Sequence, residues 1–155
     1  MPNPEPPSAV QVQSFLRQRF PMLMVDRVIS WNKGIELRAL KNISADEIQF
    51  QGHFPEYPLF PGVLTIECFA QAAAILISMS RDAPLAQGMF DAIGAVLDFH
   101  FMKPIFPGDR METHVTITKT AGSNRIVEGK CYVGDEVVAS GKLLFGEIKL
   151  SNRLS

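Results

Sequence analysis

The segment from 52 to 71 holds the side chains best suited to chemistry. His53 lies in a loop flanked by glycine and proline, where the imidazole can face a cavity. Glu67 is the only carboxylate of a long apolar run, and Gln71 follows it at the i+4 spacing that places two side chains on one face of a helix. An imidazole and a buried acid suit general acid–base catalysis.

Gly62 adds a third feature, because it stands at the predicted start of a helix. Backbone N–H groups there lack intrahelical partners, and the helix dipole favours negative charge. Together His53, Gly62 and Glu67 suit removal of a proton beside a thioester carbonyl, while the acid handles a hydroxyl group or water. The spacing alone leaves structural alternatives open: a loop histidine, a buried Glu–Gln polar pair and a glycine that only makes a turn.

The helix that carries Gly62 and Glu67 is predicted over 61–81, with proline in its first turn, strong helix formers inside and Pro84 beyond its end. Apolar residues lie nearly all around it, which is typical of a helix buried in a core. A membrane span is the alternative at this length. Glu67 and Gln71 near the middle, and the lack of a second such segment, disfavour it.

The other elements are predicted to be short. Ser8 is a candidate N-cap for a helix that ends near Pro21. Strand-like runs follow at 22–30 and 35–43, and 48–51 is predicted to connect them to the histidine loop. From residue 92 only strands are expected, at 92–102, 111–120, 125–133 and 137–148, with hairpin turns at 122–124 and 134–135.

These elements predict an α+β fold in which a curved sheet of five or six antiparallel strands wraps one central apolar helix. Because one sheet covers only part of a helix, we expect its uncovered side to meet a second copy of the chain. We expect residues 1–9, which include four prolines, to form a flexible leader, and 10–150 to form a single domain.

Composition narrows the classes of function and the compartment. Fifteen basic and sixteen acidic residues give a net charge of −1, without the basic block that nucleic acid would require. The first residues lack the positive start and apolar centre of a secretory signal. Cys68 and Cys131 lie far apart and are expected to be reduced core thiols. A cytoplasmic protein is the expectation.

The motifs around the histidine resemble a known signature. QGHFP at 51–55, PLFPGVL at 58–64, Glu67 and AQ at 70–71 resemble that of the bacterial 3-hydroxyacyl-[acyl-carrier-protein] dehydratases of type II fatty-acid synthesis. The resemblance covers about 10–145, and its outer motifs are RFP at 19–21, MVDRV at 24–28, KNI at 41–43, and Phe101, Pro104 and PGD at 107–109.

The resemblance implies a hot-dog fold, a homodimer or trimer of dimers, and an active-site tunnel at the dimer interface. It implies that His53 removes the α-proton of an acyl-carrier-protein thioester and that the Gly62 N–H polarises the thioester carbonyl. By the same resemblance, Glu67 of the partner subunit protonates the departing 3-hydroxyl. No metal, cofactor, nucleic acid or membrane span is expected.

The chain departs from the family pattern at three places. Arg17-Gln18 replaces Pro-His, Glu56 replaces a glycine, and Ala-Val-Leu at 95–97 replaces Gly-Ile-Asp. These departures leave two alternatives open, a catalytically silent hot-dog subunit that partners an active paralogue and an acyl thioesterase. They also leave open whether the pathway is housekeeping or specialised.

Other polar residues are assigned lesser roles. His100 and His114 are expected to be surface or interface residues. Four basic side chains are candidates for docking an acidic carrier protein: Arg17, Arg19, Lys103 and Arg110.

Overall fold

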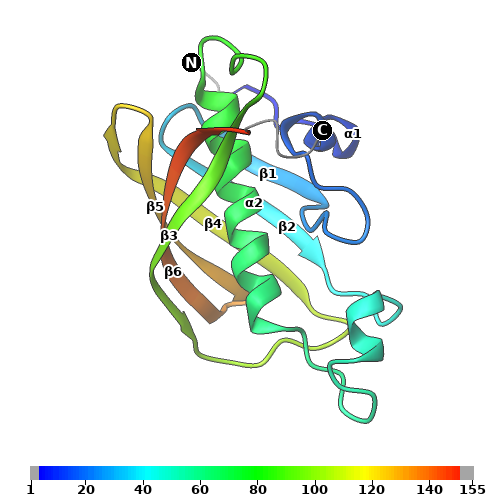
Figure 1. The fold of residues 1–155 in the computed structure, drawn as a ribbon. Helices are drawn as coiled ribbons and strands as arrows, with labels where there is room; N and C mark the ends of the chain where they lie inside the picture. The colour runs from blue at the N-terminus through cyan, green and yellow to red at the C-terminus, as the bar shows by residue number, and fades with distance from the viewer. Residues whose placement is uncertain (1–3, 151–155) are drawn as a thin grey trace.

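Six strands curve around one long helix, α2, in a computed structural model that describes residues 4–150 (Figure 1). The elements in chain order are α1 (Ala9–Phe15), β1 (Arg27–Asn32), β2 (Glu36–Asn42), the 3-10 helix η1 (Ile48–Gln51), α2 (Gly62–Ser80), β3 (Met89–Phe101), β4 (Arg110–Ala121), β5 (Asn124–Val133) and β6 (Glu136–Lys149).

Helix α2 forms because its 19 residues are mostly good helix formers placed between two signals that limit it. Pro61 precedes its first residue, Gly62, and the chain becomes extended at Arg81 before Pro84. The helix is long and apolar enough to cross a bilayer, but more than half of the residues in its apolar stretch are buried inside the protein. The predicted core helix is therefore confirmed.

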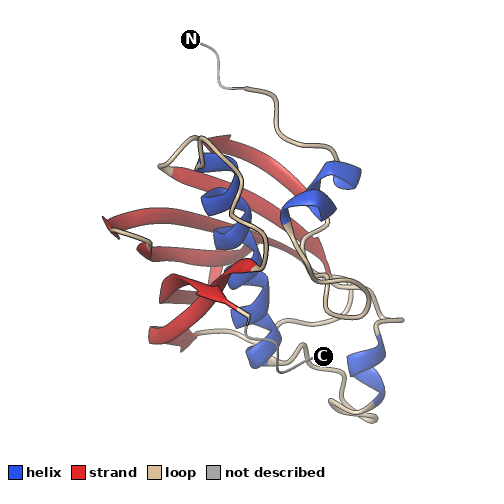
Figure 2. Ribbon diagram, turned by 45° about the horizontal axis from the view of Figure 1, so that its top comes forward, coloured by secondary structure: helices blue, strands red, loops and turns tan. Residues whose placement is uncertain are grey.

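The strands form one sheet in the order β1-β2-β4-β5-β6-β3, and all the pairs are antiparallel. Two-residue turns join β4 to β5 and β5 to β6, at the predicted places. Each turn begins with a glycine at positive φ, 60° at Gly122 and 58° at Gly134, which glycine adopts without a steric cost. The sheet wraps one side of α2, while α1 packs beside α2 near β1 (Figure 2). The α+β fold class is confirmed.

Strand β3 is the last strand of the sheet, so one row of its backbone groups has no neighbouring strand within the described chain. Several of its large apolar side chains are also exposed, and the exposure continues one residue beyond the strand: Ile93, Val96, Leu97, Phe101 and Met102. A long, exposed, apolar edge of this kind is typical of a surface that pairs with another chain.

The structure corrects two predicted boundaries near the N-terminus. Helix α1 does begin after Ser8, which forms a capping box with Gln11, but it ends at Phe15 and not near Pro21. The chain turns extended at Leu16, whose side chain is buried. The predicted strand over 22–30 begins only at 27, because the backbone of Met22 and Met24 bonds to the Gln71 side chain of α2 instead of a strand.

The predicted connection over 48–51 is one turn of 3-10 helix that leads into the histidine loop. Of the leader expected over 1–9, residues 1–3 lie outside the described residues, and α1 already begins at Ala9.

Candidate active site

The imidazole of His53 is held by a single strong contact with its own loop. Its Nδ1 lies 2.7 Å from the carbonyl oxygen of Leu59. Since a carbonyl oxygen only accepts hydrogen bonds, Nδ1 is the donor in this contact, which favours the tautomer that leaves Nε2 as the acceptor. The ring also stacks on Phe54, with centroids 4.1 Å apart. His53 is therefore oriented to accept a proton at Nε2.

A buried ion pair fixes the start of the histidine loop. Lys41 of β2 is only 7% exposed, and its Nζ lies 2.9 Å from Oε1 of Glu47. Glu47 also accepts hydrogen bonds from the Ser44 backbone N–H and from the Gln49 side chain. The Gln49 carbonyl in turn accepts the His53 N–H at 3.0 Å. The sheet is thus linked to His53 through three residues, Lys41, Glu47 and Gln49.

His53 and Gly62 line one cavity of about 420 Å³. Its walls come from the histidine loop, the first turn of α2 including Thr65, and residues 101–105 at the end of β3 and just beyond it. A cavity of this size is in the range of small-molecule sites. The structure therefore brings two of the three predicted site residues together.

Gly62 is the first residue of α2, so its N–H has no partner within the helix. The ring of Phe101 covers this position: a Cβ added to Gly62 would lie 3.1 Å from the nearest ring carbon. A glycine at this position lets the Phe101 ring lie close to the backbone of α2, where Gly62 lines the cavity.

Glu67 lies on a different side of α2 from the cavity. It is two residues beyond Thr65, which corresponds to roughly 200° around the helix axis. Its Oε1 accepts hydrogen bonds from Gln71 Nε2 at 2.8 Å and from Gln18 Nε2 at 3.0 Å. Within one chain the structure does not bring Glu67 to His53.

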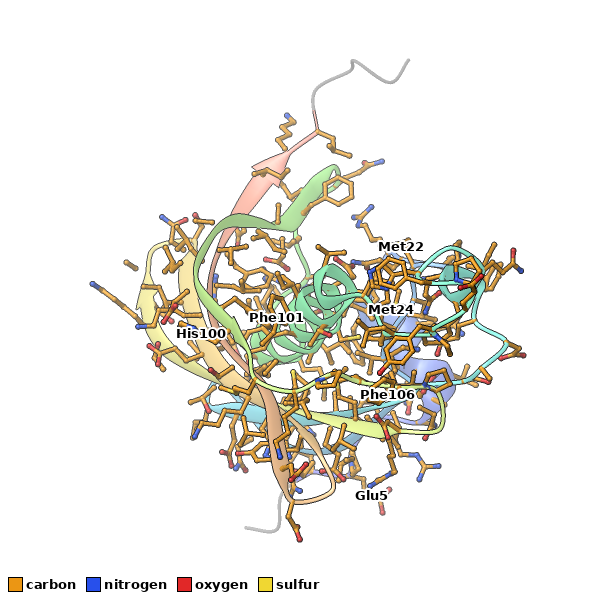
Figure 3. All side chains as sticks on the ribbon, turned by 90° about the horizontal axis from the view of Figure 1, so that it is seen from below. Glu5, Met22, Met24, His100, Phe101 and Phe106 are labelled. Atoms are coloured by element: carbon orange, nitrogen blue, oxygen red, sulfur yellow. The ribbon has the colours of Figure 1, made fainter. Side chains whose placement is uncertain are left out.

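Figure 3 shows the two sides of α2 end on. Phe101, which packs on Gly62, lies on one side, and Met22 and Met24 lie on the other. The backbone of both methionines bonds to Gln71, one helical turn from Glu67.

Two residues of this region were missed by sequence reasoning. Thr65 is 1% exposed and lines the cavity, but a threonine in a helix carries no signal of its own. Gln18 contacts Glu67 from 49 residues away, and its only signal was the departure from the family pattern.

The remaining polar candidates lie elsewhere. His100 is exposed beside Asp98, with 2.6 Å between the imidazole and the carboxylate. His114 bonds to Arg38 and Glu112 on the sheet. Burial acts to raise the pKa of Glu112, but hydrogen bonds from His114, Arg38 and Arg110 outweigh it and the pKa is lowered. Both histidines fit surface roles.

The basic residues proposed for docking divide between several sites. The guanidinium of Arg17 lies 3.6 Å from the ring centre of Phe90, and Arg110 pairs with Glu112. Arg19 bonds to backbone carbonyls of its own segment. Of the four, Lys103 lines the cavity.

Both cysteines are free and buried. Burial raises the pKa of the Cys68 thiol, and it raises the pKa of Cys131 to about 11. The prediction of reduced core thiols agrees with this environment.

Comparison with known proteins gives a consistent picture. A family model described as FabA-like domain matches residues 16–142. The chain is 37% identical over 137 residues to the 3-hydroxyacyl-[acyl-carrier-protein] dehydratase FabZ of Nitratiruptor, covering 86% of this chain and 93% of that one. It is 38% identical over 139 residues to the FabZ of Natranaerobius thermophilus, covering 90% and 96%.

Solved structures support the fold. The dehydratase heterocomplex ApeI:P from Xenorhabdus doucetiae superposes with a TM-score of 0.73 at 16% identity, over 91% of each chain. A hot-dog-like protein from Thermanaerovibrio acidaminovorans superposes with a TM-score of 0.60 at 16% identity, over 77% of this chain and 84% of that one. The predicted hot-dog fold is confirmed.

Proposed function

The chain belongs to the FabA-like domain family and is closely related to its FabZ dehydratases, and on this premise we propose that it is a hydro-lyase that converts 3-hydroxyacyl-[acyl-carrier-protein] to trans-2-enoyl-[acyl-carrier-protein] in fatty-acid or related acyl-chain biosynthesis. The observation that carries the proposal is that His53 and Gly62 line one cavity. The relatives' identity over nearly the whole chain favours dehydration over a thioesterase or a silent subunit.

In the proposed reaction, the thioester carbonyl accepts a hydrogen bond from the Gly62 N–H. This bond stabilises the negative charge that develops when the α-proton leaves. His53 Nε2 takes the α-proton, the double bond forms between C2 and C3, and the C3–O bond breaks. Glu67 gives a proton to the departing hydroxyl, which leaves as water, and exchange with solvent then restores both groups.

We infer that the reaction needs two chains, with Glu67 supplied by the partner subunit. The support is that Glu67 and the cavity lie on different sides of α2. The first turn of this helix face is also exposed: Val63, one turn before Glu67, is 72% exposed. The exposed apolar edge of β3 offers a second contact surface. A homodimer, alone or as a trimer of dimers, would cover both surfaces.

The carrier protein is proposed to approach the cavity mouth, where Lys103, which forms an ion pair with Glu136, is the one lysine or arginine of the lining. The buried, free cysteines favour a reducing compartment, which supports a cytoplasmic location.

One assay tests the proposal against its alternatives. The purified protein alone is incubated with 3-hydroxyacyl and with trans-2-enoyl carrier-protein thioesters, while enoyl absorbance and free thiol are followed. Reversible change in enoyl absorbance without thiol release is expected. Thiol release would indicate a thioesterase, and no change would indicate a silent subunit.

A further inference from the structure

Gln18 joins the segment after α1 to the acid on α2. Its Nε2 donates to Oε1 of Glu67 at 3.0 Å, and the residue is only partly exposed. The residues on both sides of Gln18 are anchored. Arg17 lies over the Phe90 ring, and Arg19 donates to the Leu16 and Gln18 carbonyls. Gln18 is therefore held at Glu67 by its own segment.

The second donor to Glu67 is Gln71, and its orientation is fixed by the backbone. Gln71 is fully buried, and its Oε1 accepts the Met24 N–H at 2.8 Å. Its Nε2 donates both to the Met22 carbonyl, at 2.6 Å, and to Glu67 Oε1. A flipped amide would place an N–H against the Met24 N–H and an oxygen against the Met22 carbonyl. Gln71 Nε2 must therefore face Glu67.

The side-chain amides of Gln18 and Gln71 donate hydrogen bonds to the same oxygen of the Glu67 carboxyl group. Oε1 of Glu67 accepts two N–H donors, while no hydrogen bond reaches Oε2 from the described residues. Among the described residues, Trp31 Nε1 is the only buried side-chain N or O atom that lacks a hydrogen-bond partner. Since Oε2 of Glu67 also lacks a partner, it is not buried and is open to solvent in the single chain. The two oxygens of Glu67 thus differ: one is held and one is accessible.

We propose that Gln18 is a positioning residue for Glu67: with Gln71 it holds Oε1, so that the transferred proton resides on Oε2 and is presented to the substrate hydroxyl. This inference rests on the proposed dehydration. A proton on Oε1 would displace one of the two amide N–H donors from that oxygen. The protein would then lose the stabilisation of about one hydrogen bond between polar groups. Gln18 also carries no charge of its own, so it orients the carboxyl group without exchanging protons with it.

The inference predicts that the donor N–H of Gln18, not its bulk, is needed. Gln18→Glu keeps the shape but replaces the N–H donor with an acceptor facing Glu67. Gln18→Leu removes all hydrogen bonding at similar size. Gln18→His restores a donor, because an imidazole N–H can point at Oε1. Gln13→Leu is the matched control, since Gln13 is an exposed glutamine on α1, five residues before Gln18.

Steady-state dehydration is measured for all the variants with one carrier-protein thioester, together with melting temperatures. For Gln18→Leu and Gln18→Glu we expect kcat to fall about tenfold or more, the scale of losing one hydrogen bond to a charged group, with KM within about twofold. Gln18→His should recover most of kcat, and Gln13→Leu should match wild type.

Two results would overturn the inference while the wild type dehydrates its substrate. The first is unchanged kcat in Gln18→Leu and Gln18→Glu. The second is equal loss in all three Gln18 variants together with lower melting temperatures, which would show that Gln18 only packs the segment. A wild type without dehydratase activity would instead refute the proposed function, and the inference with it.

Discussion

The ring of Phe101 lies directly against the backbone of Gly62, so the first residue of α2 has no room for an unhindered side chain. A Cβ at Gly62 would stand 3.1 to 3.4 Å from three ring carbons. Phe101 is 55% exposed at the exposed edge of the sheet and lines the same cavity as His53. Through this contact Gly62, whose N–H is proposed to bind the thioester carbonyl, packs against β3, the edge strand of the sheet.

Gly62→Ala is expected to lower kcat/KM about tenfold, because the Phe101 ring, which lines the cavity, must shift by a few tenths of an ångström to admit the new Cβ. Stability should change by about 1 kcal/mol or less, since the ring is the flexible end of an exposed side chain. Adding Phe101→Leu should restore part of the activity. Full activity in Gly62→Ala alone would contradict a role for this close approach. Kinetics and thermal melts check both results.

His53→Ala should lower the dehydration rate by about a hundredfold or more, because it removes the proposed base. His53→Asn is the matched variant: its side-chain amide can still donate to the Leu59 carbonyl, but it offers no basic nitrogen. Both variants should be inactive and keep their fold by circular dichroism. Activity retained in His53→Asn would show that the loop contact matters and the base does not.

Glu67→Gln should remove activity with little loss of stability. The amide keeps the shape of the carboxyl group, and its carbonyl oxygen can still accept from Gln18 and Gln71. Burying a neutral group also costs less than burying an ionisable one. A thermal melt and the dehydration assay test this together. A marked drop in melting temperature would indicate a structural polar network and favour a silent subunit.

Mixing inactive His53→Ala with inactive Glu67→Gln subunits should restore part of the activity. A mixed dimer can assemble one site with an intact His53 from one chain and an intact Glu67 from the other. Light scattering should give a dimer or a multiple of it at micromolar concentration. An active monomer, or no recovery in mixtures shown to exchange subunits, would contradict the two-chain site.

The thiols should make stability fall at high pH. An unfolded thiol loses its proton above the ordinary pKa of 9.0, whereas burial raises the pKa of Cys131 to about 11 in the folded protein. The folded state therefore binds the proton more tightly, so this contribution is fully present below pH 9 and is lost between pH 9 and 11. Two pKa units correspond to at most about 3 kcal/mol. Urea denaturation of wild type and a Cys68→Ala, Cys131→Ala double variant should diverge over that range.

Local signals in the sequence were enough to predict most of the elements. Helix α2 was predicted over 61–81 and spans Gly62–Ser80, because proline and helix formers act on their own neighbourhood. The hairpin turns at Gly122 and Gly134 were predicted for the same reason. Helix α1 ends at Phe15, and the extended Leu16 that follows it packs into the core, a long-range contact that no local pattern shows.

The candidate site was predicted only in part. The motifs identified His53, Gly62 and Glu67, but their relative placement depends on contacts distant in sequence. That Glu67 faces away from the cavity follows from the helical phase once Thr65 is seen in the wall. The hydrogen bond from Gln18 spans 49 residues and is set by the path of the chain after α1, so the sequence offered no spacing from which to infer it.

The order of the elements along the chain has a consequence for synthesis on the ribosome. Helix α2 is apolar enough to pass for a membrane span, yet four of the strands, β3 to β6, follow it. The 69 residues from 81 to 149 must still be made before that part of the sheet is complete. At about 5–20 residues per second, translation takes roughly 3 to 14 s over this distance. During that interval only β1, β2 and α1 have been made that can pack against α2. The apolar helix is therefore most vulnerable to mistargeting and aggregation before β3 to β6 complete the sheet around it.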